Sequence, residues 1–161
     1  MKTIPLSASD IARFWPKIDK TEDCWIWTAA LTRGYGVFKV RIDNKPYMKK
    51  AHRITYELLV GPIPEGHGLD HMCHREACVI PAHLRPVTQK QNMENRLTAN
   101  AGSASGVRGV HWNASRQKWQ VIVGHHGKHY RGGSFDDPAL AGVAAKALRA
   151  KLFTHSDQEI D

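Results

Sequence analysis

Residues 69–84 read LDHMCHREACVIPAHL, and residues 88–92, a little further along the chain, read TQKQN. Within the first stretch, Cys73, Cys78 and His83 follow one another at intervals of five residues. Thiolate and imidazole groups at such short spacing suit tetrahedral zinc, which needs a fourth ligand. The sequence has one further cysteine, Cys24, and a Cys3His set would use every cysteine of the chain. These four residues are therefore the predicted ligands of a structural zinc ion.

The segment from Gly61 to Val87 is rich in loop-forming residues and predicts short strands at most. A short polar loop of this kind does not fold stably without a cross-link, which favours a zinc ion as part of the fold. The alternative is a buried thiol cluster in which His83 is an ordinary hydrogen-bonded residue. Three unpaired cysteines also argue against a disulfide scaffold.

The groups that phosphodiester hydrolysis requires lie next to the expected zinc ligands. The neutral imidazole of His71, whose ordinary pKa is about 6.5, suits a base that activates water. A hard ion such as Mg²⁺ prefers oxygen ligands, and Asp70 and Asn92 offer a carboxylate and an amide oxygen. An Asp-His pair alone is more often a surface feature than a catalytic one, so the spacing carries the interpretation.

Relative to His71, the other residues of this set lie at fixed offsets: Cys73 at +2, Cys78 at +7, His83 at +12 and Asn92 at +21. This pattern resembles the His-Cys box homing endonucleases, a branch of the HNH or ββα-metal nuclease superfamily, and also the phage HNH proteins, over about residues 24–96. The resemblance implies an α+β fold of the ββα-metal type. It implies His71 as general base, Asp70 and Asn92 as ligands of a catalytic Mg²⁺ or Mn²⁺ ion, and structural Zn²⁺ on Cys24, Cys73, Cys78 and His83.

Two further positions, Arg53 and Ile80, can be compared with the residues that these families carry. Arg53 matches an arginine of similar phage proteins and is a candidate for stabilising charge on the phosphate in the transition state. The alternative is an exposed arginine on a helix. Ile80 departs from the pattern, because these families carry Asn before the proline. Since Ile cannot brace the loop through side-chain hydrogen bonds, we expect a less stable loop around His83.

Local patterns predict several elements in the first half. Ser7 predicts the start of a capped helix that ends near Pro16. Strands are expected at residues 24–27 and 35–41, with a turn at residues 43–44. Further helices are expected at residues 51–60 and 88–96.

Charge is unevenly distributed along the chain. The formal net charge is +8, from 23 Lys and Arg against 15 Asp and Glu. From Asn95 to Phe135 there is no acidic residue, which favours a polyanionic partner such as nucleic acid for this part of the chain. Residues 98–106 read TANAGSASG and predict a linker. We therefore expect a nuclease domain at residues 1–97, a DNA-binding domain at residues 107–155 and a tail at residues 156–161.

Residues 107–113, 118–124 and 128–133 alternate in polarity and predict a three-stranded meander. Asp137-Pro138 then predicts the start of a helix. The run GVRGVHW at residues 106–112 resembles the ethylene-response-factor-type (APETALA) domain, a three-stranded antiparallel sheet packed on one helix, which is also found attached to phage HNH nucleases. Members lay the sheet in the major groove of DNA. The candidate DNA contacts are Arg108, His111, Trp112, Lys118, Gln120, His126 and Arg131.

The leading interpretation is a phage-type, homing-endonuclease-like enzyme that nicks or cuts double-stranded DNA, with a homodimer left open. No apolar run approaches the roughly 18 residues of a membrane span, and the N-terminal stretch lacks an apolar signal core. We therefore expect a cytoplasmic protein that associates with the nucleoid of the host cell and is not secreted. The alternatives are a non-catalytic, zinc-stapled DNA-binding regulator and an RNA-binding module, since basic aromatic sheets also stack single-stranded bases.

Overall fold

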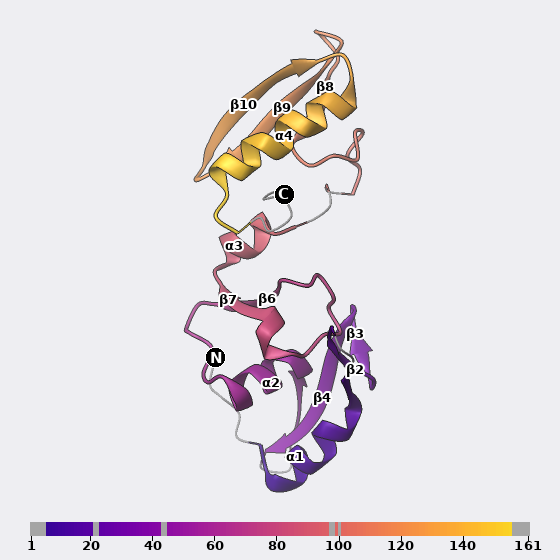
Figure 1. Cartoon of the computed structure of the whole chain (residues 1–161), viewed down its shortest axis with the longest axis vertical. Coiled ribbons are helices and arrows are strands. Elements are labelled where there is room, and N and C mark those ends of the chain that lie inside the picture. Colours follow the sequence, from indigo (N-terminus) through magenta and orange to yellow (C-terminus); the bar gives the residue numbers. More distant parts are fainter. Residues whose placement is uncertain (1–5, 21–22, 43–44, 97–98, 100, 156–161) are drawn as a thin grey trace. The chain divides into compact units, whose positions relative to one another are not determined.

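The structure, a computed structural model, describes residues 6–20, 23–42, 45–96, 99 and 101–155 (Figure 1). It confirms a mixed α+β fold built on small antiparallel sheets. The chain divides into two compact units, Met1–Thr88 and Gln89–Asp161. The expected turn at residues 43–44, residue 97 at the end of the expected nuclease domain, residues 98 and 100 of the expected linker, and the tail at residues 156–161 lie outside the described residues.

The first unit begins with the helix α1 (Ala8–Phe14), as its capping signal predicted. The Ser7 hydroxyl accepts a hydrogen bond from the Asp10 backbone N–H, and the Asp10 carboxylate accepts one from the Ser7 N–H. This reciprocal capping box satisfies two N–H groups that a helix start otherwise leaves unpaired. The unit continues with η1 (Trp15–Lys17), β1 (Ile18–Lys20), β2 (Trp25–Trp27), β3 (Leu31–Thr32), β4 (Tyr35–Ile42), β5 (Lys45–Lys50), α2 (Ala51–Leu59), β6 (Gly68–His71), η2 (Pro81–His83) and β7 (Leu84–Val87).

The core of the first unit lies between β4 and α2. Along β4 the buried positions alternate with more exposed ones, as a half-buried strand requires. Gly36 is needed on this face, because a Cβ atom there would lie 2.6 Å from the Trp27 ring. The buried cluster consists of Phe14, Trp27, Phe38, Val40, Ala51, Ile54 and Val79.

The hairpin β6–β7 and the segment between its strands carry most of the predicted site residues. The two strands pair antiparallel, with His71 opposite Leu84. The segment between them is attached to β2 by backbone hydrogen bonds, from Trp27 N–H to the Ala77 oxygen (2.9 Å) and from Val79 N–H to the Trp25 oxygen (2.7 Å). These hydrogen bonds hold the segment next to Cys24, the residue directly before β2.

The second unit contains the helix α3 (Gln89–Glu94), the strands β8 (Val110–Asn113), β9 (Lys118–His125) and β10 (Lys128–Phe135), and the helix α4 (Pro138–Leu152). The strands form an antiparallel sheet in the order β10-β9-β8, and α4 packs along it (Figure 1). The Asp137 side chain caps α4 by accepting a hydrogen bond from Ala139 N–H. The core between helix and sheet is formed by Val110, Val121, Ala141 and Ala145.

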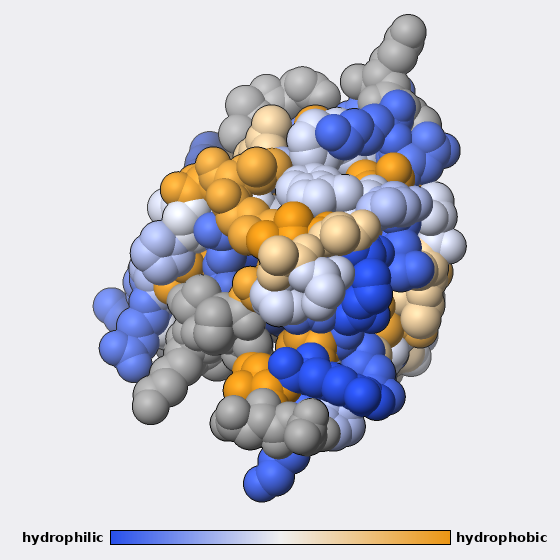
Figure 2. Space-filling view, turned by 90° about the horizontal axis from the view of Figure 1, so that it is seen from below, coloured by the Kyte–Doolittle hydropathy of each residue, from blue (hydrophilic) through white to orange (hydrophobic). Residues whose placement is uncertain are grey.

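On the face drawn in Figure 2, small hydrophobic patches lie between larger hydrophilic areas. Within the described residues, no helix is both long and apolar enough to cross a membrane.

Candidate active site and metal centre

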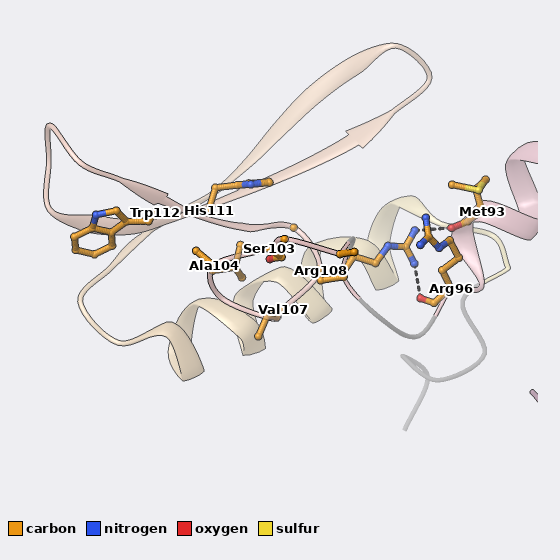
Figure 3. Close-up of a pocket in the computed structure, with 13 residues that line it drawn as sticks. Met93, Arg96, Ser103, Ala104, Val107, Arg108, His111 and Trp112 are labelled. Atoms are coloured by element: carbon orange, nitrogen blue, oxygen red, sulfur yellow. Dashed lines mark hydrogen bonds between the residues drawn. The ribbon is translucent and has the colours of Figure 1, made fainter.

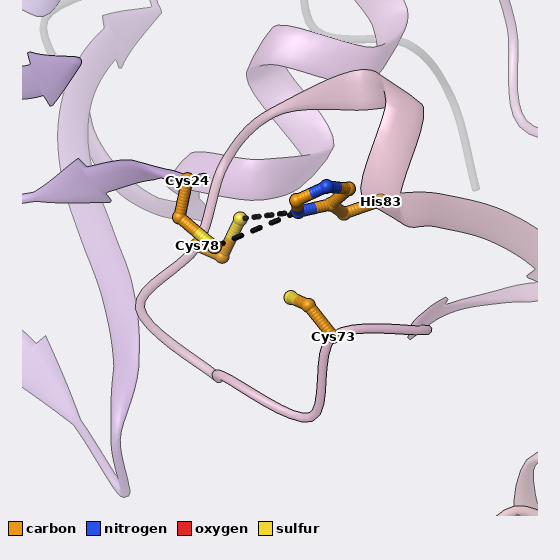
Figure 4. Close-up of side chains that lie close together, drawn as sticks. All are labelled: Cys24, Cys73, Cys78 and His83. Atoms are coloured by element: carbon orange, nitrogen blue, oxygen red, sulfur yellow. Dashed lines mark hydrogen bonds between the residues drawn. The ribbon is translucent and has the colours of Figure 1, made fainter. Parts of the chain in front are cut away.

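The four predicted zinc ligands come together in the first unit. Cys24 immediately precedes β2, Cys73 and Cys78 lie between β6 and η2, and His83 ends η2. Their ligand atoms all lie within 4.8 Å of one another (Figure 4). His83 Nδ1 lies 3.6 Å from Cys24 Sγ and 3.7 Å from Cys78 Sγ. Ligand atoms around tetrahedral zinc are separated by about 3.5–3.8 Å, so the two His83 distances match a zinc site, and the four residues provide its Cys3His donor set.

The chemistry of the cluster also favours a cation. Burial raises the pKa of the Cys78 thiol to about 12, against which a backbone hydrogen bond with Ile80 lowers it. A buried thiolate is therefore costly unless a positive charge compensates it. A metal ion supplies that charge and deprotonates its thiol ligands.

His71 ends β6, and its side chain is 7% exposed. The Nε2 atom of His71 lies 2.9 Å from the backbone oxygen of Cys78. A carbonyl oxygen only accepts hydrogen bonds, so Nε2 must carry the proton of the neutral ring and Nδ1 must carry the lone pair. Burial lowers the pKa of His71, although the hydrogen bond to Cys78 and the Asp70 charge act in the opposite direction. The neutral ring that results can accept a proton at Nδ1.

Two aromatic side chains that the sequence did not single out surround this imidazole. The His52 ring packs edge-to-face on His71 with centroids 4.8 Å apart, and the Tyr35 ring lies 5.8 Å from that of His71. Burial lowers the pKa of His52 to about 3, with smaller contributions from the charges of His71, Lys50 and Arg53. One neutral imidazole and one phenol thus pack against the predicted base, whose own side chain is buried.

The Asp70 carboxylate forms an ion pair with Arg85 across the hairpin. It stands opposite Arg85 on β7, and its Oδ2 atom accepts hydrogen bonds from Arg85 Nη2 (3.0 Å) and Nε (3.1 Å). The pairing compensates a carboxylate that is 7% exposed. Sequence reasoning passed over Arg85, because the pairing register that brings it opposite Asp70 is visible only once both strands are placed.

Asn92 and Arg53 complete the predicted catalytic set. Asn92 is exposed on α3 and belongs to the second unit. Asp70 and His71 belong to the first, so the joining of Asn92 to them stays a prediction. Arg53 lies in the first turn of α2 in a half-buried position, and its charge is close enough to contribute to the lowered pKa of His52. Its contact with phosphate also stays a prediction.

In the second unit, strand register sorts the predicted DNA contacts by face. Val110 and Val121, which pair across β8 and β9, point into the core beneath α4. Side chains alternate between faces, so the neighbouring positions lie on the face that α4 does not cover. That open face carries four of the predicted contacts: His111, Lys118, Gln120 and Arg131.

The other three predicted contacts lie elsewhere. Trp112 is cross-strand partner to Trp119 with ring centroids 5.1 Å apart, on the face that α4 covers, yet it is 47% exposed at the edge of that face. His126 lies in the turn between β9 and β10 with a positive φ of 49°. Arg108 precedes β8, and its guanidinium donates hydrogen bonds to backbone oxygens of Met93, Glu94 and Arg96.

Comparison with known proteins shows a family and two phage proteins that the chain resembles. Residues 49–94 match the HNH endonuclease family. The chain is 30% identical to protein 3.8 of Escherichia phage T7 over 118 residues, which cover 72% of this chain and 94% of that protein. It is also 35% identical to protein 7.7 of the same phage over 78 residues, covering 48% of this chain and 57% of that protein. No solved structure matches the chain.

Proposed function

The chain belongs to the family of protein 3.8 of phage T7 and carries an HNH endonuclease domain, and we propose that it is a metal-dependent endonuclease that hydrolyses phosphodiester bonds of double-stranded DNA. The observation that carries this proposal is the hydrogen bond from His71 Nε2 to the Cys78 oxygen, at 2.9 Å. It leaves Nδ1 as the acceptor that a general base needs.

His71 would take a proton from the attacking water at Nδ1. The ring is held by Cys78 on one side and packed by His52 on another, so its orientation is set before the substrate arrives. Fixed orientation of this kind lowers the entropic cost of reaching the transition state. The lowered pKa keeps the imidazole uncharged at neutral pH, as proton abstraction requires.

Asp70 and Asn92 would hold a Mg²⁺ or Mn²⁺ ion, which when bound offsets the charge of the scissile phosphate and of the leaving oxygen. Arg85 would keep the Asp70 carboxylate oriented through its two hydrogen bonds. Arg53 would add positive charge at the phosphate.

The Cys3His cluster would hold a structural Zn²⁺ ion. Cys78 contributes its Sγ atom to this cluster and its backbone oxygen to His71. A metal that fixes Cys78 would therefore also fix the ring that acts as base. In this proposal zinc orders the site and takes no part in the reaction.

The second unit would bind DNA through the open face of its sheet, as the resemblance to ethylene-response-factor-type domains suggests. His111, Gln120 and Arg131 offer hydrogen-bonding and basic groups on this face, and the major groove is wide enough to admit strands. Lys118 would contact phosphate, which positions the protein without specifying sequence. The enzyme would be homing-endonuclease-like, nicking or cutting one site that this unit selects.

One observation favours a second candidate, a DNA-binding regulator without catalysis. Ile80 occupies the N-cap position of η2 and provides no side-chain hydrogen bond there. An Asn at this position would cap the turn that presents His83. A loop weakened in this way could lose the geometry of the base while the zinc cluster still supports the fold.

Incubation of supercoiled plasmid with the purified chain separates the two candidates. We expect nicked or linear plasmid with Mg²⁺ or Mn²⁺, and intact plasmid with EDTA. The Ile80→Asn variant should cut at least as fast as the wild type. Intact plasmid with both proteins and with every divalent ion tested, together with retained DNA binding, would support the regulator.

A further inference from the structure

The short helix α3, which carries Asn92, is held at its C-terminal end by the side chain of Arg108, which belongs to the sheet domain (residues 107–155 of the second unit). The Arg108 guanidinium donates from Nη1 to the oxygens of Glu94 (2.7 Å) and Arg96 (2.8 Å), and from Nη2 to the oxygen of Met93 (2.7 Å). Figure 3 shows this side chain reaching from the segment before β8 to the end of α3. The last carbonyl groups of a helix lack partners within the helix and carry partial negative charge, so a guanidinium is well suited to hold them.

A second attachment comes from the other end of the unit. The Glu94 side chain is 4% exposed, and its Oε2 atom accepts hydrogen bonds from the Thr154 N–H (3.0 Å) and hydroxyl (3.2 Å), just beyond α4. Its Oε1 atom pairs with Lys90 Nζ at 2.5 Å. A buried carboxylate needs such partners, so Glu94 ties α3 to the end of α4.

Arg108 is itself held firmly within the sheet domain. Its backbone oxygen accepts a hydrogen bond from the buried guanidinium of Arg149 on α4. Its guanidinium lies over the Phe153 ring, 5.0 Å from the centroid. Gly109 follows with a φ of +83°, and a Cβ atom there would lie 3.4 Å from the Ile122 oxygen. The backbone that presents Arg108 is thus locked between α4 and β9.

We infer that Arg108 and Glu94 are positioning residues for Asn92. By fixing α3 to the sheet domain, they set the direction in which Asn92, two residues before Glu94, presents its amide oxygen to the divalent ion. This inference rests on the proposed function, in which Asn92 is a ligand of that ion. The sheet domain then has two roles, because the domain proposed to bind DNA also supports a residue of the proposed metal site. Arg108 then has a structural partner in place of a DNA base.

The test measures Mn²⁺ binding to the zinc-loaded, full-length chain by electron paramagnetic resonance. Asn92→Ala removes a proposed ligand and should weaken Mn²⁺ binding by at least about tenfold. Arg108→Ala should weaken it by about tenfold, since outer-shell changes cost about 10–100-fold in metal affinity. The double variant should bind Mn²⁺ no more weakly than Asn92→Ala alone, because Arg108 acts through Asn92. Arg116→Ala, an exposed arginine of the β8–β9 turn, is the matched control and should bind like the wild type.

Amide hydrogen exchange at residues 89–94 accompanies the titration and should be faster in Arg108→Ala. Arg108→Lys, which keeps the charge and loses the fork of donors, should fall between Arg108→Ala and the wild type. These two readouts keep the test valid if the alanine variant is poorly folded. In EDTA, the affinity of every variant for duplex DNA should lie within about threefold of that of the wild type. The Arg108 guanidinium donates to backbone oxygens at the end of α3 and, in this inference, contacts neither phosphate nor base.

Three outcomes overturn the inference without removing Asn92 from the metal site. In the first, Asn92→Ala weakens Mn²⁺ binding and Arg108→Ala does not, which removes the positioning role and leaves the proposed function intact. In the second, the two losses multiply in the double variant, which makes Arg108 independent of Asn92. In the third, Arg108→Ala chiefly weakens DNA binding in EDTA, which makes Arg108 a DNA contact. If Asn92→Ala itself binds Mn²⁺ like the wild type, the proposed metal site fails and the inference falls with it.

Discussion

The backbone oxygen of Cys78 lies 2.9 Å from Nε2 of His71, and the Sγ atom of the same cysteine belongs to the Cys3His cluster. One residue therefore connects the expected zinc site with the expected base. Since the hydrogen bond determines which ring nitrogen carries the lone pair, loss of the metal should disturb the base as well as the fold.

Zinc content and stability provide the first prediction. The purified chain should contain one zinc ion, and Cys24→Ser should lose it and lower the free energy of unfolding of the first unit by more than about 3 kcal/mol, because metal binding is coupled to folding. Atomic emission and urea unfolding measure the two effects. His67→Ala, a histidine of the same region outside the cluster, should retain zinc and stability. A stable, metal-free wild type would show that the cluster is only a group of buried thiols.

A second prediction concerns the support of the loop from α2. The Thr55 hydroxyl donates to the Val79 oxygen at 2.6 Å in a fully buried position. Thr55→Val keeps the shape and leaves that oxygen without this donor, which should cost about 1–3 kcal/mol of unfolding free energy. Thr55→Ser retains the hydroxyl and should lose less. Equal loss in both variants, measured by urea unfolding, would attribute the effect to packing instead of the hydrogen bond.

The third prediction follows from the buried His52. Its pKa is lowered to about 3 in the folded chain by burial, whereas in the unfolded chain it is about 6.5. Between these values the unfolded state binds the extra proton, so stability decreases as the pH falls through this window. The slope should reach up to about 1.4 kcal/mol per pH unit.

Urea unfolding of the wild type and His52→Gln, at pH 7.5 and at pH 5.5, isolates this contribution, because both proteins keep the same zinc ligands. The variant should lose less stability than the wild type over this interval. Identical pH dependence would show that His52 becomes protonated as readily when folded as when unfolded.

The fourth prediction addresses the open face of the sheet. Arg131 is exposed on this face, and Arg131→Ala should weaken duplex binding and reduce the slope of log K against log salt by about one phosphate contact, or about 0.9. Lys146 is exposed on α4, the helix that covers the opposite face, so Lys146→Ala should leave the slope unchanged. An equal effect of both substitutions, measured by fluorescence anisotropy across a salt series, would show diffuse charge instead of a defined surface.

The sequence anticipated elements with strong local signals. The capping box of Ser7 and Asp10 predicted α1, and Asp137-Pro138 predicted the start of α4. The short strands β1 and β3 and the exposed strand β5 were missed, because segments of two to six residues with little alternation depend on their neighbours. The helix predicted at residues 88–96 ends at Glu94, whose backbone oxygen accepts a hydrogen bond from the Arg108 guanidinium.

The candidate site was predictable where residues of fixed chemistry recur at fixed spacing. Spacing identified Cys73, Cys78 and His83 as ligands, and Cys24, which is distant in sequence, followed as the one further cysteine of the chain. His52, Tyr35 and Arg85 were not found, because each joins the site through tertiary packing or strand register, which leaves no local pattern. For Arg108, its charge and its place in the GVRGVHW run suggested DNA, and neither gave a sign of its contact with α3.

The most direct test of the account is the single-turnover rate of nicking of supercoiled plasmid by the wild type and by His71→Ala, with Mg²⁺ and with DNA at saturation. We predict that the wild type nicks the plasmid and that His71→Ala is slower by at least about a hundredfold, the usual contribution of a general base, while its zinc content and DNA affinity stay unchanged. Equal rates for the two proteins, or an intact plasmid with the wild type, would contradict the account.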